Sequence, residues 1–187
     1  MNFGFDLDGV LFPWHENVYQ WCRDNLDVDV SYREFWSWPD GWFGSRRSKP
    51  FIHDIVRLPE LYLTPLAKKT HIKAIHRINR LIPGEIHYIT ARPVEVTDAT
   101  KEWFQFSELP FSDNVHFTKK QGGKKEVLLK RLNCSFYVED RVDYAESVLG
   151  VSNLFLVNRI WNEGFEHPDV VRIKDVKDIP NILERGL

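Results

Sequence analysis

The run FGFDLDGVL at residues 3–11 places two carboxylates directly after a short apolar segment typical of a strand. Asp6 and Asp8 are two residues apart, so in a strand their side chains share one face. Gly9 then lets the chain turn. Two like charges held this close, with no basic residue beside them, repel unless a cation or a proton lies between them. The run therefore favours a divalent metal site that leaves one carboxylate free for nucleophilic or acid–base chemistry.

Two other interpretations of this run are an EF-hand calcium loop and a plain turn. An EF-hand loop whose glycine is Gly9 needs an acid at position 4 and a glutamate at position 15. The chain has Gly4 and His15 there, which excludes that loop. An Asp-Gly turn between apolar runs is common, so the run alone leaves the turn interpretation open.

Composition excludes several classes of protein. The 187 residues suffice for one domain with a proper core and a small insertion. A formal net charge of -2 argues against general nucleic-acid or membrane binding, although a local basic patch stays possible. No apolar stretch approaches the roughly 20 residues of a membrane span, and the N-terminus lacks a signal-peptide pattern. The two cysteines form no disulfide framework and no metal motif, so we expect a cytoplasmic protein.

Short apolar runs alternate with segments of helical periodicity along most of the chain. We expect strands at residues 2–5, 85–89, 115–117, 135–138 and 153–157. Helices are expected at 72–80, 94–104 and 125–132, with a shorter one at 143–149. This alternation predicts an α/β chain, a Rossmann-like three-layer fold with a mostly parallel central sheet.

Residues 13–65 do not fit this alternation. They are irregular and rich in aromatic residues in a chain that contains seven tryptophans. We expect a small helical cap inserted after the first strand, with residues 1–12 and 66–187 forming the catalytic core. In open α/β sheets the ligand crevice lies at the carboxyl ends of the strands, so the cap is expected to lie over it.

Three further segments end predicted strands with polar residues. In the first, the Thr90 hydroxyl, the backbone N–H groups near Ala91 and the forked guanidinium of Arg92 are suited to binding an oxyanion. A threonine before a helix is also a common N-cap, and that alternative stays open. In the second, Lys124 and Lys125 open a helix, although a solvated basic run would look the same. In the third, the adjacent acids Glu139 and Asp140 end a strand, where acids often ligate a cation.

Together these segments resemble the four motifs of the haloacid dehalogenase-like superfamily. The matching residues occur in the family's order, each after a strand: Asp6-Leu7-Asp8-Gly9-Val10, Thr90, Lys124 and Glu139-Asp140. The second acid, Asp8, matches the phosphatase branch, because dehalogenases lack it. The segments at 88–93 and 156–162, with the insertion, look like the 5′(3′)-deoxyribonucleotidases and their bacterial and phage relatives. Ile160 stands where those relatives often have proline, and Glu139 replaces the more usual aspartate.

The resemblance implies a Mg²⁺-dependent phosphomonoesterase. Asp6 would attack phosphorus and form an aspartyl-phosphate, and Asp8 would act as general acid and then base. Mg²⁺ would be bound by Asp6, the backbone carbonyl of Asp8 and Asp140, with Glu139 ordering its waters. The phosphoryl oxygens would be held by Thr90 and Lys124. Lys125 is the other candidate for the lysine, and we rank it second because the Lys-x-x-apolar spacing favours Lys124. Further substrate contacts are expected at Gly9, Ala91, Arg92 and Lys125.

The substrate is expected to be a small phosphorylated molecule, above all a (deoxy)nucleoside monophosphate. Trp14 and Trp38 in the cap are candidates for stacking a nucleobase. The alternative is that the cap aromatics mostly form its core, since a small helical unit needs large side chains to have one. The seven histidines are scattered, and the sequence assigns none of them a role. A phosphatase for another metabolite or for a nucleic-acid end, or a phosphate-binding protein without turnover, stays open.

Overall fold

The computed structural model describes residues 1–37, 41–45, 48–120 and 123–186. Its centre is a six-stranded sheet in the order β3-β2-β1-β4-β5-β6, and every neighbouring pair is parallel. The strands are β1 (Asn2–Phe5), β2 (Ile86–Thr90), β3 (Val115–Phe117), β4 (Cys134–Glu139), β5 (Asn153–Val157) and β6 (Val170–Ile173). This is the strand order of Rossmann-like folds, in which the chain reverses its direction of travel between β1 and β4.

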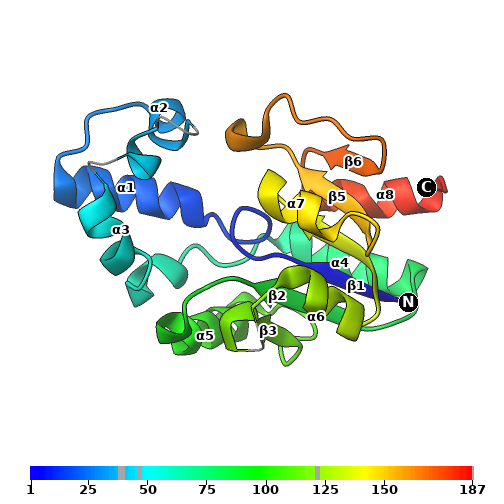
Figure 1. Ribbon diagram of the computed structural model, residues 1–187. Coiled ribbons are helices and arrows are strands. Elements are labelled where there is room, and N and C mark those ends of the chain that lie inside the picture. The colour runs from blue at the N-terminus through cyan, green and yellow to red at the C-terminus, as the bar shows by residue number, and fades with distance from the viewer. Residues whose placement is uncertain (38–40, 46–47, 121–122, 187) are drawn as a thin grey trace.

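Helices cover both faces of the sheet (Figure 1). One face carries α4 (Lys69–Leu81), α5 (Thr97–Ser107) and α8 (Ile179–Glu184), packed on a cluster that includes Phe3, Phe5 and Phe155. The other carries α6 (Lys125–Arg131) and α7 (Val142–Val148), packed on Ile89, Tyr137 and Leu156. The central strands are buried on both faces, as their nearly continuous apolar sequences require. The predicted three-layer α/β fold is confirmed.

A helical segment lies between β1 and β2, to one side of the sheet in Figure 1. It contains α1 (Trp14–Leu26), α2 (Tyr32–Trp36), α3 (Lys49–Ile55) and the short 3-10 turns Trp42–Gly44 and Pro59–Tyr62. Its apolar side chains form a cluster of their own around Val18, Cys22, Phe35 and Ile55, joined by Val96 and Ala99 at the start of α5. Ser31 begins α2 with a capping box to Glu34. Most of the aromatic side chains of this segment are therefore packed together.

The predicted strands agree with the structure to within one residue at each end, and two elements were not predicted. Strand β6 is an edge strand of which three residues are only half buried, so its apolar signal is weak. Helix α8 has six residues and contains Pro180, which leaves too little periodicity to recognise. The helix predicted at 94–104 begins as a 3-10 turn at Val94–Val96 before α5. In the described part of the chain, no helix has the length and apolar character that crossing a membrane requires.

The register of the sheet decides what gathers at its carboxyl edge. Phe5 at the end of β1 is level with Tyr88 in β2 and with Val138 in β4. The residues that follow these three positions therefore meet at one edge, on either side of β1. They include Asp6, Thr90 and the pair Glu139-Asp140, and this is the switch point where open α/β sheets bind ligands.

Candidate active site

Asp6 is the central side chain of this edge. Its side chain is 7% exposed, and its Oδ1 lies 2.8 Å from the Nζ of Lys125. The backbone N–H of Asp6 donates to the Val138 carbonyl, which fixes the residue as an extension of β1 toward β4. A buried carboxylate is thus held in place by the sheet on one side and by an ammonium group on the other.

The structure places Lys125 beside Asp6, and not Lys124, which the sequence favoured. Lys125 is the first residue of α6, and its side chain is 1% exposed beside Asp6. Lys124 is the extended N-cap residue, and its side chain is 74% exposed and 3.7 Å from Glu126. Two successive residues at a helix start point in different directions, and here the second one enters the site.

Glu139 is fully buried beneath Lys125 rather than open to solvent. Its Oε2 accepts from the Lys125 ammonium at 2.7 Å and from the Tyr137 hydroxyl at 3.2 Å. Its Oε1 accepts from the backbone N–H groups of Asp140 and Arg141 at 3.0 and 3.2 Å. Both oxygens therefore accept hydrogen bonds from the protein, and these bonds tie Glu139 to Lys125 and to the loop that carries Asp140. The expected role of Glu139 in ordering the waters of a metal ion stays a prediction.

The buried charges of this edge do not balance. Three carboxylates meet here, those of Asp6, Glu139 and Asp140. Among the described residues, the ammonium of Lys125 is the one positive group that forms an ion pair with Asp6 and Glu139. Burial, followed by the charge of Glu139, raises the pKa of Asp6 to about 7, while Lys125 acts in the opposite direction. Burial and the charges of Glu139 and Asp6 also raise the pKa of Asp140 well above its usual value. A bound cation would offset this excess of negative charge.

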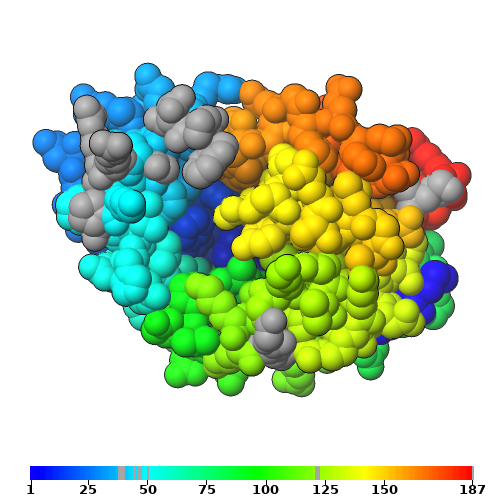
Figure 2. Space-filling model, in the orientation of Figure 1, coloured from blue at the N-terminus to red at the C-terminus, as the bar shows by residue number. Residues whose placement is uncertain are grey.

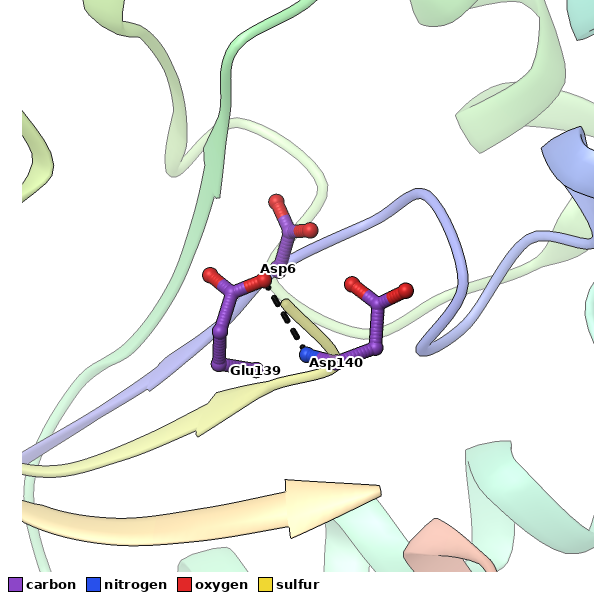
Figure 3. Close-up of side chains that lie close together, drawn as sticks. All are labelled: Asp6, Glu139 and Asp140. Atoms are coloured by element: carbon purple, nitrogen blue, oxygen red, sulfur yellow. Dashed lines mark hydrogen bonds between the residues drawn. The ribbon is translucent and has the colours of Figure 1, made fainter. Parts of the chain in front are cut away.

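The geometry fits a divalent cation. Oxygens of Asp6, Glu139 and Asp140 all lie within 4.8 Å of one another, and Figure 3 shows the three carboxyl groups around one space. Oδ1 of Asp140 is buried and has no hydrogen-bond partner among the described residues. Oδ2 of Asp140 accepts from the indole Nε1 of Trp161 at 3.0 Å. An orphaned carboxylate oxygen among acids is what a hard cation such as Mg²⁺ would satisfy.

Gly9 shapes the turn that follows the two aspartates. Its φ is 81°, and a Cβ added there would overlap the Asp140 carboxylate, so no other residue fits without a shift. Its N–H donates to the Phe12 carbonyl, and its own carbonyl accepts from Arg159 at 2.9 and 2.6 Å. Both backbone groups are therefore paired within the protein, and a substrate contact of Gly9 stays a prediction.

Arg92 was expected to grip a phosphate, and the structure pairs it with Asp8 instead. Arg92 Nε lies 3.0 Å from both carboxylate oxygens of Asp8, and Nη2 lies 2.6 Å from Oδ1. The Arg92 side chain has no exposed surface, whereas that of Asp8 is 21% exposed. Thr90 is also buried, and its Oγ1 accepts from the backbone N–H of Arg92 at 3.2 Å. A hydroxyl that accepts a hydrogen bond can still donate one.

Two cavities meet at this edge. The smaller, about 200 Å³, contains Asp6 and Asp8 in its wall together with Ala91, Lys119 and Lys125. The larger, about 760 Å³, has six rings in its wall, Trp14, His15, Phe35, Trp36, Phe43 and Trp161, together with the charged residues Arg141, Asp143 and Glu146. Trp14, His15, Val56 and Arg141 line both. Figure 2 shows the surface hollowed between the cyan helical segment and the yellow α7, with blue N-terminal residues recessed between them.

The sequence missed several residues that line these cavities. His15, to which no role was assigned, stacks on Trp161 with ring centroids 3.9 Å apart and contacts Trp36 edge-on at 4.8 Å. Burial lowers its pKa to about 3, and the nearby Arg141 and Arg159 act in the same direction. Of the predicted stacking residues, Trp14 lines both cavities, whereas Trp38 lies outside the described residues. Trp161 lies in the segment 156–162 that carried the resemblance, but neither Trp161 nor Lys119 was named as a site residue.

Comparison with known proteins identifies distant relatives. No protein-family model matches the chain. A protein of Oceanobacillus iheyensis named "Putative nucleotidase" is 23% identical over 172 residues, covering 84% of this chain and 86% of the relative. A Bacillus cereus protein of the same name is 23% identical over 194 residues and covers both chains completely.

Solved structures match the whole chain at low identity. A HAD-family hydrolase from Deinococcus radiodurans with bound phosphate and sodium has a TM-score of 0.63 at 14% identity, covering 99% of this chain and 96% of the other. A Bacillus subtilis "putative HAD-hydrolase" bound to magnesium gives 0.65 at 10% identity, with 98% of each chain covered. The L-2-haloacid dehalogenase of Xanthobacter autotrophicus gives 0.59 at 12% identity, with 100% and 98% covered. The resemblance seen in the motifs is confirmed, and the chain has the fold of the haloacid dehalogenase-like hydrolases.

Proposed function

We propose that the protein is a metal-dependent phosphomonoesterase in which Asp6 is the nucleophile. The observation that carries this proposal is the pairing of a buried Asp6 carboxylate with Lys125 at 2.8 Å, in the wall of a cavity that Asp8 also lines. Because the same fold serves dehalogenases, the fold alone does not select the reaction. Asp8 favours phosphoryl transfer, since that reaction needs an acid–base group beside the nucleophile.

In the first step, a carboxylate oxygen of Asp6 attacks phosphorus and the bond from phosphorus to the ester oxygen breaks. Asp8 gives its proton to the departing oxygen, which leaves as an alcohol. The Lys125 ammonium, held by Glu139 at 2.7 Å, lies where it can stabilise the phosphoryl oxygens as charge accumulates on them. The product of this step is an aspartyl-phosphate on Asp6.

In the second step, water attacks phosphorus and the bond between phosphorus and Asp6 breaks, which releases inorganic phosphate. Asp8, now ionised, accepts the proton of that water. Mg²⁺, held by Asp6 and Asp140, would neutralise phosphoryl charge and orient the group for in-line attack. Ligation by the Asp8 carbonyl and a contact from the Thr90 hydroxyl are part of the same proposal.

The substrate we favour is a (deoxy)nucleoside monophosphate. The aromatic cavity of about 760 Å³ adjoins the proposed phosphate site and shares Trp14 and His15 with it. Aromatic rings next to a phosphate site suit a base attached to a sugar phosphate. The two distant relatives named as nucleotidases point the same way. Residues 13–65 would then serve as the cap that supplies most of these rings. Both cysteines are free and buried, which accords with a cytoplasmic location.

The test is phosphate release from a panel of nucleoside monophosphates and sugar phosphates, with Mg²⁺ and with EDTA. Asp6→Asn should reduce turnover to background, whereas Asp24→Asn on the exposed face of α1 should leave it unchanged. Release that peaks on nucleotides and requires the metal would support the proposal. Equal release from Asp6→Asn and the wild type would reject Asp6 as nucleophile. A preference for sugar phosphates would reject the nucleotide substrate alone.

A further inference from the structure

We propose that Arg92 is a positioning residue that holds the Asp8 carboxylate for proton transfer, and that it does not bind the substrate phosphate. This inference rests on the proposed phosphatase function. It replaces the expectation from sequence, in which the guanidinium formed part of the phosphate site.

The pairing uses the forked geometry of the guanidinium. Nε of Arg92 contacts both oxygens of Asp8 at 3.0 Å, and Nη2 contacts Oδ1 at 2.6 Å. A lone aspartate can occupy several staggered rotamers, and contacts to both oxygens select one of them. Asp8 is 21% exposed and borders the catalytic cavity, so its free face is turned to the space where a substrate would bind.

The guanidinium itself cannot easily reorient. It lies over the rings of Phe12 and Tyr62, 4.8 and 4.7 Å from their centroids, and 5.8 Å from that of Trp103. Its Nη1 donates to the Thr100 hydroxyl at 3.1 Å. With no exposed surface and each of its three nitrogens hydrogen-bonded, Arg92 would have to break these contacts to reach a phosphate.

The position of Asp8 matters most when the leaving group needs a proton. An alkoxide leaves poorly from phosphorus unless an acid protonates it, whereas p-nitrophenolate leaves readily as an anion. A variant with a misplaced Asp8 should therefore lose activity on alkyl phosphates and keep most of it on p-nitrophenyl phosphate. A lost phosphate ligand would instead weaken binding of both esters alike.

The experiment compares kcat/KM of the wild type and Arg92→Lys for a nucleoside monophosphate and for p-nitrophenyl phosphate, since this constant covers steps up to the aspartyl-phosphate. Lysine keeps the charge but cannot hold two oxygens in a fork. We expect a loss of about 100-fold on the nucleotide and less than about 10-fold on p-nitrophenyl phosphate. Equal losses on the two esters, or a loss confined to KM, would overturn the inference.

Two further variants keep the test decisive if Arg92→Lys folds poorly. Asp8→Asn removes the proton donor, so adding Arg92→Lys to it should not change the ratio between the two esters any further. Thr100→Val leaves the ion pair and removes one support of the guanidinium, and it should shift the ratio in the same direction by about 3-fold. An unchanged ratio in folded Thr100→Val together with additive effects in the double variant would reject the positioning role. If the wild type releases no phosphate from either ester, the proposed function itself fails and the positioning role falls with it.

Discussion

The strand edge and the aromatic cavity share one hollow but are built differently. At the strand edge, Asp6, Lys125 and Glu139 are at most 7% exposed, and the ammonium lies within 2.8 Å of both acids. In the aromatic cavity, rings contact rings, and the buried indole N–H of Trp36 has no partner among the described residues. The strand edge is held by ion pairs between buried groups, whereas the rings of the aromatic cavity are held mainly by contacts with one another. We therefore expect substitutions at the strand edge to lower the catalytic rate sharply, and substitutions in the aromatic cavity to alter substrate preference in small steps.

Two neighbouring lysines, one buried in the site and one exposed, should differ most when each is replaced. Lys125→Ala should lower kcat/KM by about 10²–10³-fold, because it removes the buried donor beside Asp6. It also leaves Glu139 without its charged partner, so the melting temperature should be checked. Lys124→Ala, one residue earlier and exposed, should change kcat/KM by less than about 2-fold. Steady-state kinetics of the two variants decide the matter, and a larger effect at Lys124 would overturn the assignment.

This pair also shows what the sequence can and cannot predict at the strand edge. Asp6, Thr90 and Asp140 were predicted to converge because each follows a strand of one parallel sheet, and the register brings those strand ends together. The lysine was misplaced because it lies on a helix. Lys124 is still extended and Lys125 is the first helical residue, so their side chains point in different directions, and local sequence does not fix where α6 begins.

The second prediction concerns the unpaired oxygen of Asp140. Asp140→Asn removes a charge from the cluster, so we expect about a 100-fold loss of activity and a higher Mg²⁺ concentration for half-maximal rate. Mg²⁺ titrations of phosphate release provide the measurement. Asp169→Asn, at an acid whose side chain is 80% exposed, is the matched control. A metal dependence of Asp140→Asn identical to that of the wild type would remove Asp140 from the metal site.

The aromatic cavity was far less predictable than the strand edge. His15, Arg141 and Trp161 come from α1, from the loop after β4 and from the turn after β5, and they meet only in the folded chain. The resemblance covered the segment that contains Trp161, but no local pattern predicts that these three side chains line one cavity. The sequence identified the segment that carries many of the rings, and it named Trp14 correctly as a residue near the site.

The third prediction uses the one histidine enclosed by these rings. Burial lowers the pKa of His15 to about 3 in the folded protein, below its usual value of 6.5. As the pH falls, His15 therefore takes up a proton in the unfolded chain before it does so in the folded one. The free energy of unfolding decreases as the pH falls from about 6.5 toward 3. At pH 5 this loss is about 2 kcal/mol.

Unfolding by denaturant at pH 7.5 and pH 5 measures this loss. His15→Phe should lose less stability between the two pH values than the wild type does, because it has no ring to protonate. His53→Phe, at a side chain that is 71% exposed, should lose as much stability between the two pH values as the wild type does. Parallel pH dependence in all three proteins would show that His15 does not contribute.

The smallest effect tests whether the two regions are coupled. Trp161 connects the two regions through its own contacts, because its ring stacks on His15 while its Nε1 donates to Asp140. Trp36 also contacts His15, but its buried Nε1 has no partner among the described residues. The two tryptophans therefore form a matched pair that differs in the contacts of Nε1 with Asp140, which for Trp161 are 3.0 Å to Oδ2 and 3.1 Å to the backbone carbonyl.

Phenylalanine at either position keeps a ring and removes the indole N–H. Trp161→Phe should raise the Mg²⁺ concentration for half-maximal activity by about 3- to 10-fold, because losing one hydrogen bond to a charged group costs on the order of 1 kcal/mol. Trp36→Phe should leave the Mg²⁺ dependence unchanged and alter at most the preference among nucleotides. If both variants shift the metal dependence equally, the shift comes from repacking of the rings. A shift confined to Trp161 would mean that the residue which shapes the substrate cavity also orients Asp140, so that binding in one region reaches the chemistry of the other through one indole N–H.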